Sequence, residues 1–351
     1  MPDQYPAPHH QEHLGPASHH QEYLGRSERD ACHHPGRLLS FLILALCFLC
    51  GGVSAAGTRL MVVQGSGGEE AYDQLFSQWI GELKESLTSR VESMMVLAPG
   101  SENAPSRERI LASLAQYATL GARDLFVLFL IGHGSADQTQ YRFNIPGPDI
   151  TAEELAGALD RIPAQVVVLN GTSASGASLQ ALSRKNRVVV TATRSGRETI
   201  PPRFAGFLIE GLDGRADADK NGSVSILELY QYARQKTAEW YQQQNRLASE
   251  HSLLDDSGSG KGSENPAPGS ADGALAASLM IRPPEHLAAA SGASRELLSR
   301  KLELESAVER LRFGKSEMSP EQYQEQLEKL MLELARVNRQ IGAEAQQGTP
   351  K

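Results

Sequence analysis

The chain has 351 residues and a formal net charge of −8 at neutral pH, from 34 Lys and Arg against 42 Asp and Glu. Because it is acidic and has no basic stripe, nucleic acid is excluded as an expected partner. All three cysteines, Cys32, Cys47 and Cys50, lie in the first 56 residues. Disulfides therefore cannot hold the remainder together, and its fold must depend on a hydrophobic core and on any bound metal.

Residues 1–56 are predicted to be an N-terminal extension and a secretory signal peptide. An apolar run at residues 38–50 follows Arg26, Arg29 and Arg37, and small residues follow it as far as Ala55 and Ala56. This order is typical of a signal peptide, and the run is shorter than the ~20 residues that span a bilayer. We therefore predict cleavage after Ala55 or Ala56 and a periplasmic or secreted protein. If uncleaved, the segment would be an N-terminal transmembrane anchor.

Residues 57–283 alternate between predicted strands and helices. The expected strands are 59–64, 93–97, 124–131, 165–169, 187–193 and 278–281. Helical periodicity separates most of them, at 70–88, 107–120, 152–160, 176–184, 203–211 and 225–249. Such alternation predicts an α/β fold, with helices on both faces of a mostly parallel six-stranded sheet. The strands at 124–131 and 165–169 are almost entirely apolar, which is typical of central strands.

Composition changes twice beyond residue 254. Residues 255–273 are rich in Gly, Ser, Pro and acids, and we predict a mobile insertion loop because they have little apolar surface to bury. After a linker at 284–294, residues 295–343 predict a helical hairpin, followed by a tail at 344–351. Ser319 and Gln322 form a capping box at the second helix. The hairpin packs on itself or on the domain, or else it is a coiled coil that binds a partner or forms a homo-oligomer.

A twelve-residue stretch, 217–228, has the spacing of an EF-hand calcium loop. The expected ligands occupy its positions 1, 3, 5, 7, 9 and 12, namely Asp217, Asp219, Asn221, Ser223, Ser225 and Glu228. Gly222 allows the sharp turn at position 6. The pattern predicts calcium as the bound metal, and the alternative is a solvated acidic turn. The preceding helix should end near Leu212, which indicates half of an EF-hand rather than a pair.

Two small polar motifs follow the central strands. His133 stands in Gly-His-Gly after the first, and Ser173-Ala174-Ser175-Gly176 follows the second. This layout resembles the caspase and legumain-like clan (peptidase C13-like), in which the second strand leads into Cys-x-Ser-Gly. The resemblance covers residues 58–283 and implies a caspase-like three-layer sandwich. It also implies a bacterial type, in which calcium motifs recur.

By the same resemblance, His133 and Ser173 match the His/Cys dyad, and the amide of Gly134 matches an oxyanion donor. The nucleophile position holds serine instead of cysteine, and Gly171 replaces a common acidic residue. A neighbouring imidazolium can lower a thiol pKa enough to form a thiolate, but a serine hydroxyl needs a base within hydrogen-bond reach. We therefore expect these positions to be inactive.

Three functions are compatible with the sequence. The first is an exported, calcium-binding pseudopeptidase that acts as a binding or scaffolding module, with a peptide or protein partner at the cleft beside Ser173 and at the hairpin. The second is an active hydrolase that uses Ser173 and His133. The third is a coiled-coil interaction protein anchored at the envelope, with membrane contact only through an uncleaved signal segment.

Overall fold

The computed structural model describes residues 57–137, 140–282, 290, 292–313, 315 and 318–347. The predicted extension and signal peptide lie outside these residues, as does most of the predicted linker. Within the described part, no helix has both the length and the apolar character needed to cross a membrane.

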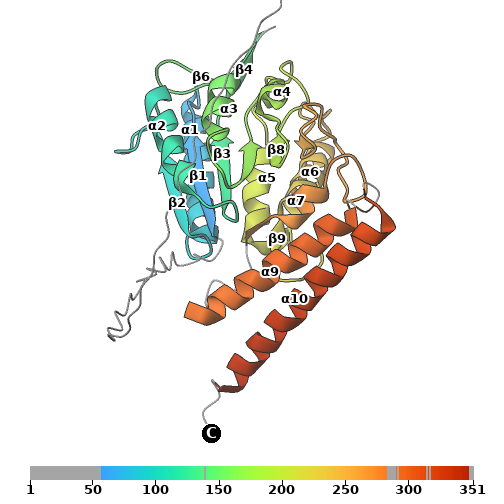
Figure 1. Ribbon diagram of the computed structural model, residues 1–351. Helices are drawn as coiled ribbons and strands as arrows, with labels where there is room; N and C mark the ends of the chain where they lie inside the picture. The colour runs from blue at the N-terminus through green and yellow to red at the C-terminus, as the bar shows by residue number, and fades with distance from the viewer. Residues whose placement is uncertain are drawn as a thin grey trace, which may run out of the picture. The chain divides into compact units, whose positions relative to one another are not determined.

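The centre of the fold is a six-stranded sheet in the order β10-β8-β7-β3-β1-β2 (Figure 1). Its strands are β1 (Thr58–Gln64), β2 (Ser93–Leu97), β3 (Leu125–Ile131), β7 (Gln165–Asn170), β8 (Arg187–Thr191) and β10 (Leu253–Asp255). All neighbours pair in parallel except β10, which runs antiparallel to β8. The predicted sheet, six-stranded and mostly parallel, is confirmed.

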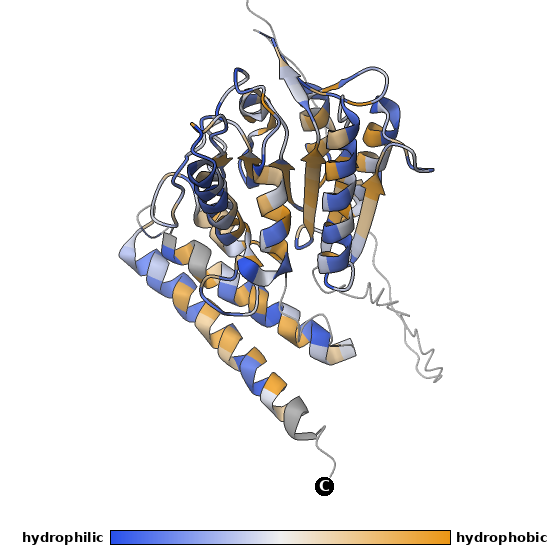
Figure 2. Cartoon of the chain, turned by 180° about the vertical axis from the view of Figure 1, so that it is seen from behind, coloured by the Kyte–Doolittle hydropathy of each residue, from blue (hydrophilic) through white to orange (hydrophobic). Residues whose placement is uncertain are grey.

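Helices cover both faces of the sheet, so the predicted three layers are also present. One face packs against α1 (Glu70–Leu87), α5 (Phe204–Glu210), α6 (Ile226–Gln243) and α7 (Ala274–Ser278). The other packs against α2 (Arg107–Gln116), α3 (Ala152–Leu159) and α4 (Leu179–Leu182). Successive side chains of β1 enter opposite cores, since Leu60 and Val62 join the first and Met61 and Val63 the second. Figure 2 shows the strands of the central sheet as the most hydrophobic part of the domain.

Short elements complete the domain. A small antiparallel sheet contains β4 (Gly134–Ala136), β5 (Tyr141–Phe143) and β6 (Ile150–Thr151). A second small sheet pairs β9 (Val224–Ser225) with β11 (Met280–Arg282). The expectation that residues 278–281 form the last strand of the main sheet is therefore wrong, because β11 pairs with the predicted calcium loop and β10 is the sixth strand.

The segment 255–273 is held at its start, which argues against the mobile loop expected there. The Asp255 side chain is fully buried and accepts hydrogen bonds from the amides of Gly258, Ser259 and Gly260. Asp256 accepts from the amides of Gly273 and Ala276, at 2.8 Å each. Asp255 is thus bonded to amides of its own segment, and Asp256 ties the end of the segment and the start of α7 to its beginning.

The predicted helical hairpin is confirmed and consists of α9 (Gly292–Phe313) and α10 (Pro320–Gln347). It begins inside the expected linker and extends into the expected tail. Ser319 and Gln322 exchange hydrogen bonds of 3.2 Å as the capping box requires. The side chains of Leu304, Val308 and Leu311 on α9 are buried, and Glu303 pairs with Arg123 of the domain at 3.5 Å. The hairpin therefore packs both on itself and on the domain.

Candidate functional site

Ser173 lies three residues beyond β7, and its hydroxyl bonds to the backbone of Gly134 at the start of β4. The side chain is 2% exposed. Its Oγ accepts a hydrogen bond of 3.1 Å from the Gly134 amide and donates one of 2.9 Å to the Gly134 carbonyl. A side chain at Gly134 would lie 2.5 Å from the Ser173 carbonyl oxygen, so only glycine fits this contact. The amide expected to serve as an oxyanion donor is thus bonded to the expected nucleophile.

His133 lies two residues beyond β3 and is bonded elsewhere. Its Nε2 is 2.8 Å from the carbonyl oxygen of Gly67, and because a carbonyl only accepts, Nε2 carries the proton. Tyr72 and Phe76 pack edge-on against the ring, with centroids 5.3 and 5.8 Å away. Among the described residues, no hydrogen bond joins His133 to Ser173. The two predicted catalytic residues occupy neighbouring strand ends without forming a dyad.

A buried polar network fixes the turn that carries Ser173. The Tyr141 hydroxyl lies 2.6 Å from Thr172 Oγ1 and donates to Asn170 Oδ1 at 3.3 Å. Burial raises the pKa of Tyr141 to about 12, so the phenol stays protonated and can donate. Asn170 Nδ2 donates to Ser178 Oγ at 3.0 Å. No sequence motif predicts this network, because its members are single polar residues on separate elements.

Ser175, also in the motif, connects the ends of β7 and β8. Its Oγ accepts from the amides of Ala192 (3.0 Å) and Thr193 (3.1 Å), and its side chain is fully buried. Ala174 adopts a left-handed conformation with φ 54° and donates its amide to the carbonyl of Glu198 at 2.8 Å. The serines of this motif therefore satisfy backbone groups, which is a structural role.

The predicted calcium loop brings its acids together. One carboxylate oxygen from each of Asp217, Asp219 and Glu228 lies within 4.8 Å of the others. Gly222 has φ 83°, and its amide donates to Asp217 Oδ2 at 2.9 Å. Asn221 donates its amide to Asp219 Oδ1 at 3.0 Å. The turn therefore directs backbone amides at the carboxylates and holds them close despite their like charge.

The remaining predicted ligands also offer oxygen atoms, which suit a hard cation such as calcium. Ser223 is the seventh position, where the backbone carbonyl serves as ligand. Ser225 caps α6, accepting from the Glu228 amide at 3.2 Å and donating to Glu228 Oε2 at 2.7 Å. Glu228 Oε1 accepts from the Ala218 amide at 3.1 Å. Carboxylate, amide and carbonyl oxygens in this set are the ligands that calcium prefers.

The helices around the loop agree with the sequence expectation. Beyond α5 comes one further turn, η3 (Gly211–Arg215), but Gly214 within it has φ 110° and is not helical, so the entry helix ends near Leu212, several residues before Asp217. The exit helix α6 begins at Ile226, inside the loop. β11 pairs with the loop through β9, and the Ile226 amide donates to the Leu279 carbonyl at 2.9 Å. A strand from the same chain thus lies where a second EF-hand loop would otherwise pair.

Comparison with known proteins gives only distant likenesses. No protein-family model matches the chain, and no curated protein matches its sequence. Similar solved structures include a protein from Geobacter sulfurreducens, the Drosophila initiator caspase Dronc and caspase-1 from Spodoptera frugiperda. Their identities are 10, 11 and 10%, and their TM-scores are 0.39, 0.35 and 0.37. Each match covers 57% of this chain, and 92, 79 and 88% of the respective neighbours. Likeness at this level establishes neither family nor activity.

Proposed function

We propose that this chain is an exported, calcium-binding pseudopeptidase of caspase-like type that acts as a binding or scaffolding module. The motif order supports the type, because His133 and Ser173 follow the adjacent parallel strands β3 and β7. The signal pattern in residues 38–56 supports export, and the converging acids of residues 217–228 support calcium.

The hydrogen bonding of Ser173 is the observation that carries the proposal. Serine catalysis requires a base within hydrogen-bond reach of the hydroxyl. Here the hydroxyl is hydrogen-bonded to both the amide and the carbonyl of Gly134. His133 Nε2 is bonded to the carbonyl of Gly67. Before Ser173 could attack a substrate, Ser173 and His133 would each have to break these hydrogen bonds. Ser173 would also have to move out of a site where it is 2% exposed.

A fluorophosphonate probe tests the loss of activity. We expect no labelling of the purified protein at high reagent excess, because the hydroxyl is buried and has no base. We expect Ser173→Ala to lower the free energy of unfolding by about 1–3 kcal/mol, since it leaves two buried backbone groups of Gly134 unpaired. Urea denaturation measures that loss, and exposed Ser101→Ala is the control. Labelling that disappears in Ser173→Ala would instead establish the active hydrolase.

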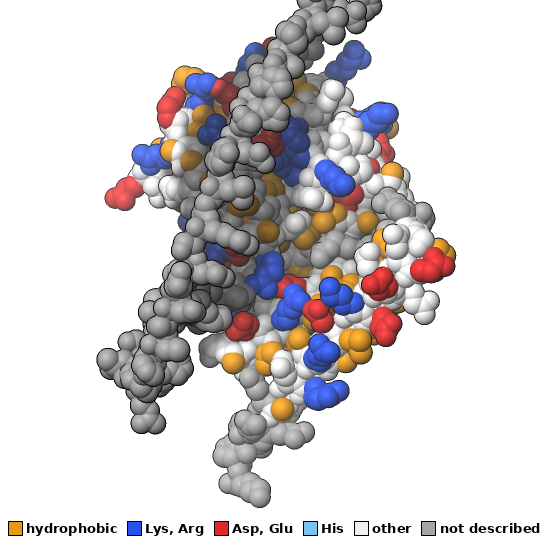
Figure 3. All heavy atoms as spheres, in the orientation of Figure 1, with side chains coloured by type: hydrophobic (Ala, Val, Ile, Leu, Met, Phe, Trp, Pro, Cys, Tyr) orange, Lys and Arg blue, Asp and Glu red, His pale blue; other side chains and the backbone are white. Residues whose placement is uncertain are grey.

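A partner surface on the hairpin is part of the proposal. Met331 and Leu332 on α10 are 48 and 52% exposed. Figure 3 shows hydrophobic side chains interspersed with Lys, Arg, Asp and Glu on this part of the molecule. Mixed apolar and charged surface of this kind suits a protein or peptide partner, and a pseudopeptidase would act through such contacts instead of through hydrolysis.

A further inference from the structure

A cavity of about 700 Å³ lies between α6 and two segments, 248–252 and 264–267. Its volume is within the range of sites that bind small molecules. Neither His133, Ser173 nor any predicted calcium ligand lines it. It is thus separate from the sites described above and does not depend on the proposed function.

The acids in the cavity wall all have partners. Glu239 pairs with Lys236 at 2.8 Å, and Glu264 pairs with Arg194 at 3.2 Å. Glu250 is buried and accepts from the amides of Arg203 (2.9 Å) and Phe204 (3.0 Å). The negative charges of the wall are therefore already engaged.

Arg234 on α6 is the exception in this wall. It is half-buried and lines the cavity, and among the described residues it has no ion pair or hydrogen bond. A guanidinium presents five donors in a planar fork, which matches a carboxylate or phosphate. The charge left without a match in this cavity is therefore positive.

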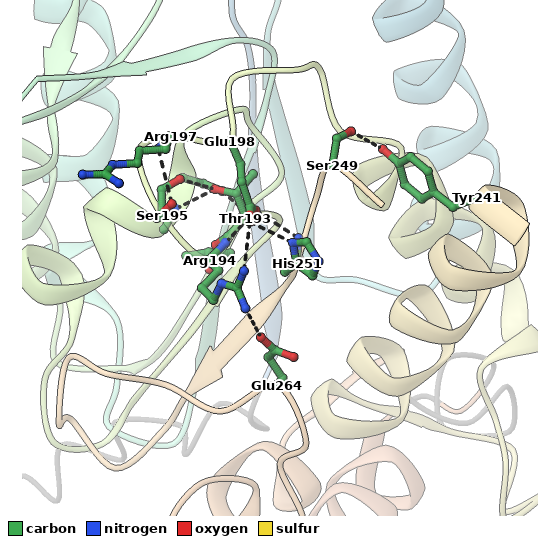
Figure 4. A network of polar contacts seen from close by, with 12 residues as sticks. Thr193, Arg194, Ser195, Arg197, Glu198, Tyr241, Ser249, His251 and Glu264 are labelled. Atoms are coloured by element: carbon green, nitrogen blue, oxygen red, sulfur yellow. Dashed lines mark hydrogen bonds and ion pairs between the residues drawn. The ribbon is translucent and has the colours of Figure 1, made fainter. Parts of the chain in front are cut away.

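His251 offers a second polar group with a fixed orientation. Its Nδ1 is 2.8 Å from Glu198 Oε1, while Glu198 Oε2 accepts from the amides of His251 and Arg194 at 3.0 Å each. Figure 4 shows the ring of His251 between the Glu198 loop and helix α6. Because the Glu198 carboxylate only accepts, Nδ1 donates to it, and Nε2 of the neutral ring is left as an acceptor for an N–H of a ligand in the cavity.

We propose that this cavity binds a carboxylate, with Arg234 as its ion-pair partner and His251 Nε2 as an acceptor for any N–H that the ligand carries. A single unmatched cation suits a single negative charge. A dianionic phosphate would bring a second negative charge that no unpaired cation of the wall could match. The carboxylate can belong to a small monocarboxylic acid or to a Glu side chain of a peptide.

Isothermal titration calorimetry of the full chain at low salt tests the proposal with two matched pairs of probes. Butyrate is compared with butyramide, which has nearly the same shape without charge. Acetyl-Gly-Glu-Gly-amide is compared with acetyl-Gly-Gln-Gly-amide, which separates the peptide source from the small acid. We expect saturable binding of one or both carboxylates and none of the amides.

Variants localise the binding. We expect Arg234→Gln to weaken it at least about tenfold, as loss of a charge-assisted hydrogen bond does, and Arg234→Lys to retain part of it. Arg246→Gln is the matched control, because Arg246 is exposed just beyond α6 and does not line the cavity; it should bind as the unaltered chain does. The proposal is overturned if neither carboxylate binds at roughly tens of millimolar, or if Arg234→Gln binds as tightly as Arg246→Gln.

Discussion

Asp124 is a buried carboxylate that holds the starts of β1 and β3 together. It accepts from the amides of Gly57 (3.2 Å) and Gly121 (2.8 Å) and pairs with Arg59 at 2.8 Å. Burial by itself would raise the pKa of Asp124, but the hydrogen bonds from Gly121, Gly57 and Arg59 outweigh it and hold the pKa below its usual value. The ionised form is therefore favoured in the folded protein.

A pH-dependent loss of stability follows from this lowered pKa. A carboxyl whose pKa is lower when folded stabilises the protein above the unfolded value of ~3.9, and that contribution is lost as the pH falls towards the folded value. We expect Asp124→Asn to lower the free energy of unfolding at pH 7 by about 1–3 kcal/mol. The difference in this free energy between the unaltered protein and the variant should shrink below pH ~3.9. Urea denaturation across pH measures it, with exposed Asp213→Asn as control. A difference independent of pH would contradict this account.

Single residues divide into those that local pattern could predict and those that it could not. His133 and Ser173 lie at the strand ends that the apolar runs predicted. Their partners could not be predicted, because Ser173 bonds to Gly134, 39 residues away, and His133 bonds to Gly67, 66 residues away. Arg234 carries no motif, and its position in a cavity appears only once α6 is packed on the domain.

Among the elements, the acidic turn at residues 217–228 was the easiest to predict, because the acids that converge in it lie within twelve residues of one another. Calcium should stabilise the folded chain by mass action. With the affinity typical of extracellular modules, ~10⁻⁴ to 10⁻³ M, about 10 mM calcium should contribute about 1.4 to 2.7 kcal/mol. Thermal unfolding in calcium and in chelator measures the shift. Asp217→Ala should abolish it, and Asp213→Ala, just outside the loop, should keep it. No shift in the unaltered chain would leave the loop as a solvated acidic turn.

The elements that escaped prediction are short or depend on distant partners. β10 and β11 have three residues each, too few to show an alternating pattern. Residues 255–263 have the composition of a flexible loop, yet Gly258, Gly260 and Gly262 have φ between 64° and 76° and let the backbone fold around the Asp255 carboxylate. Glycine content alone does not distinguish a mobile loop from a backbone wrapped around a buried acid.

At the scale of the whole molecule, the hairpin is joined to the domain through α9. Leu304 lines a cavity shared with Leu125 and Leu279 of the domain and with Leu330 of α10. Arg300 on α9 bonds to Glu333 on α10 at 2.7 Å. The apolar stripe predicted the two helices and their pairing. It could not predict the docking, since that depends on the amino-terminal edge of the sheet and on α7.

Two truncations distinguish docking from self-association. Ending the chain after Phe313 removes α10, and ending it before Gly292 removes both helices. Each buried aliphatic side chain contributes at most ~1.5–3 kcal/mol. We therefore expect the second truncation to destabilise the domain by several kcal/mol, because Leu304 and Val308 no longer cover it. If the hairpin packed only on itself, domain unfolding would be unchanged.

Sedimentation of the same proteins tests the coiled-coil alternative. Because α10 packs on α9 of its own chain, we expect the full-length protein to sediment as a monomer at micromolar concentration. A full-length dimer that becomes monomeric after either truncation would show that the stripe on α10 pairs between chains. The hairpin would then be the working part of the protein, with the domain as its support.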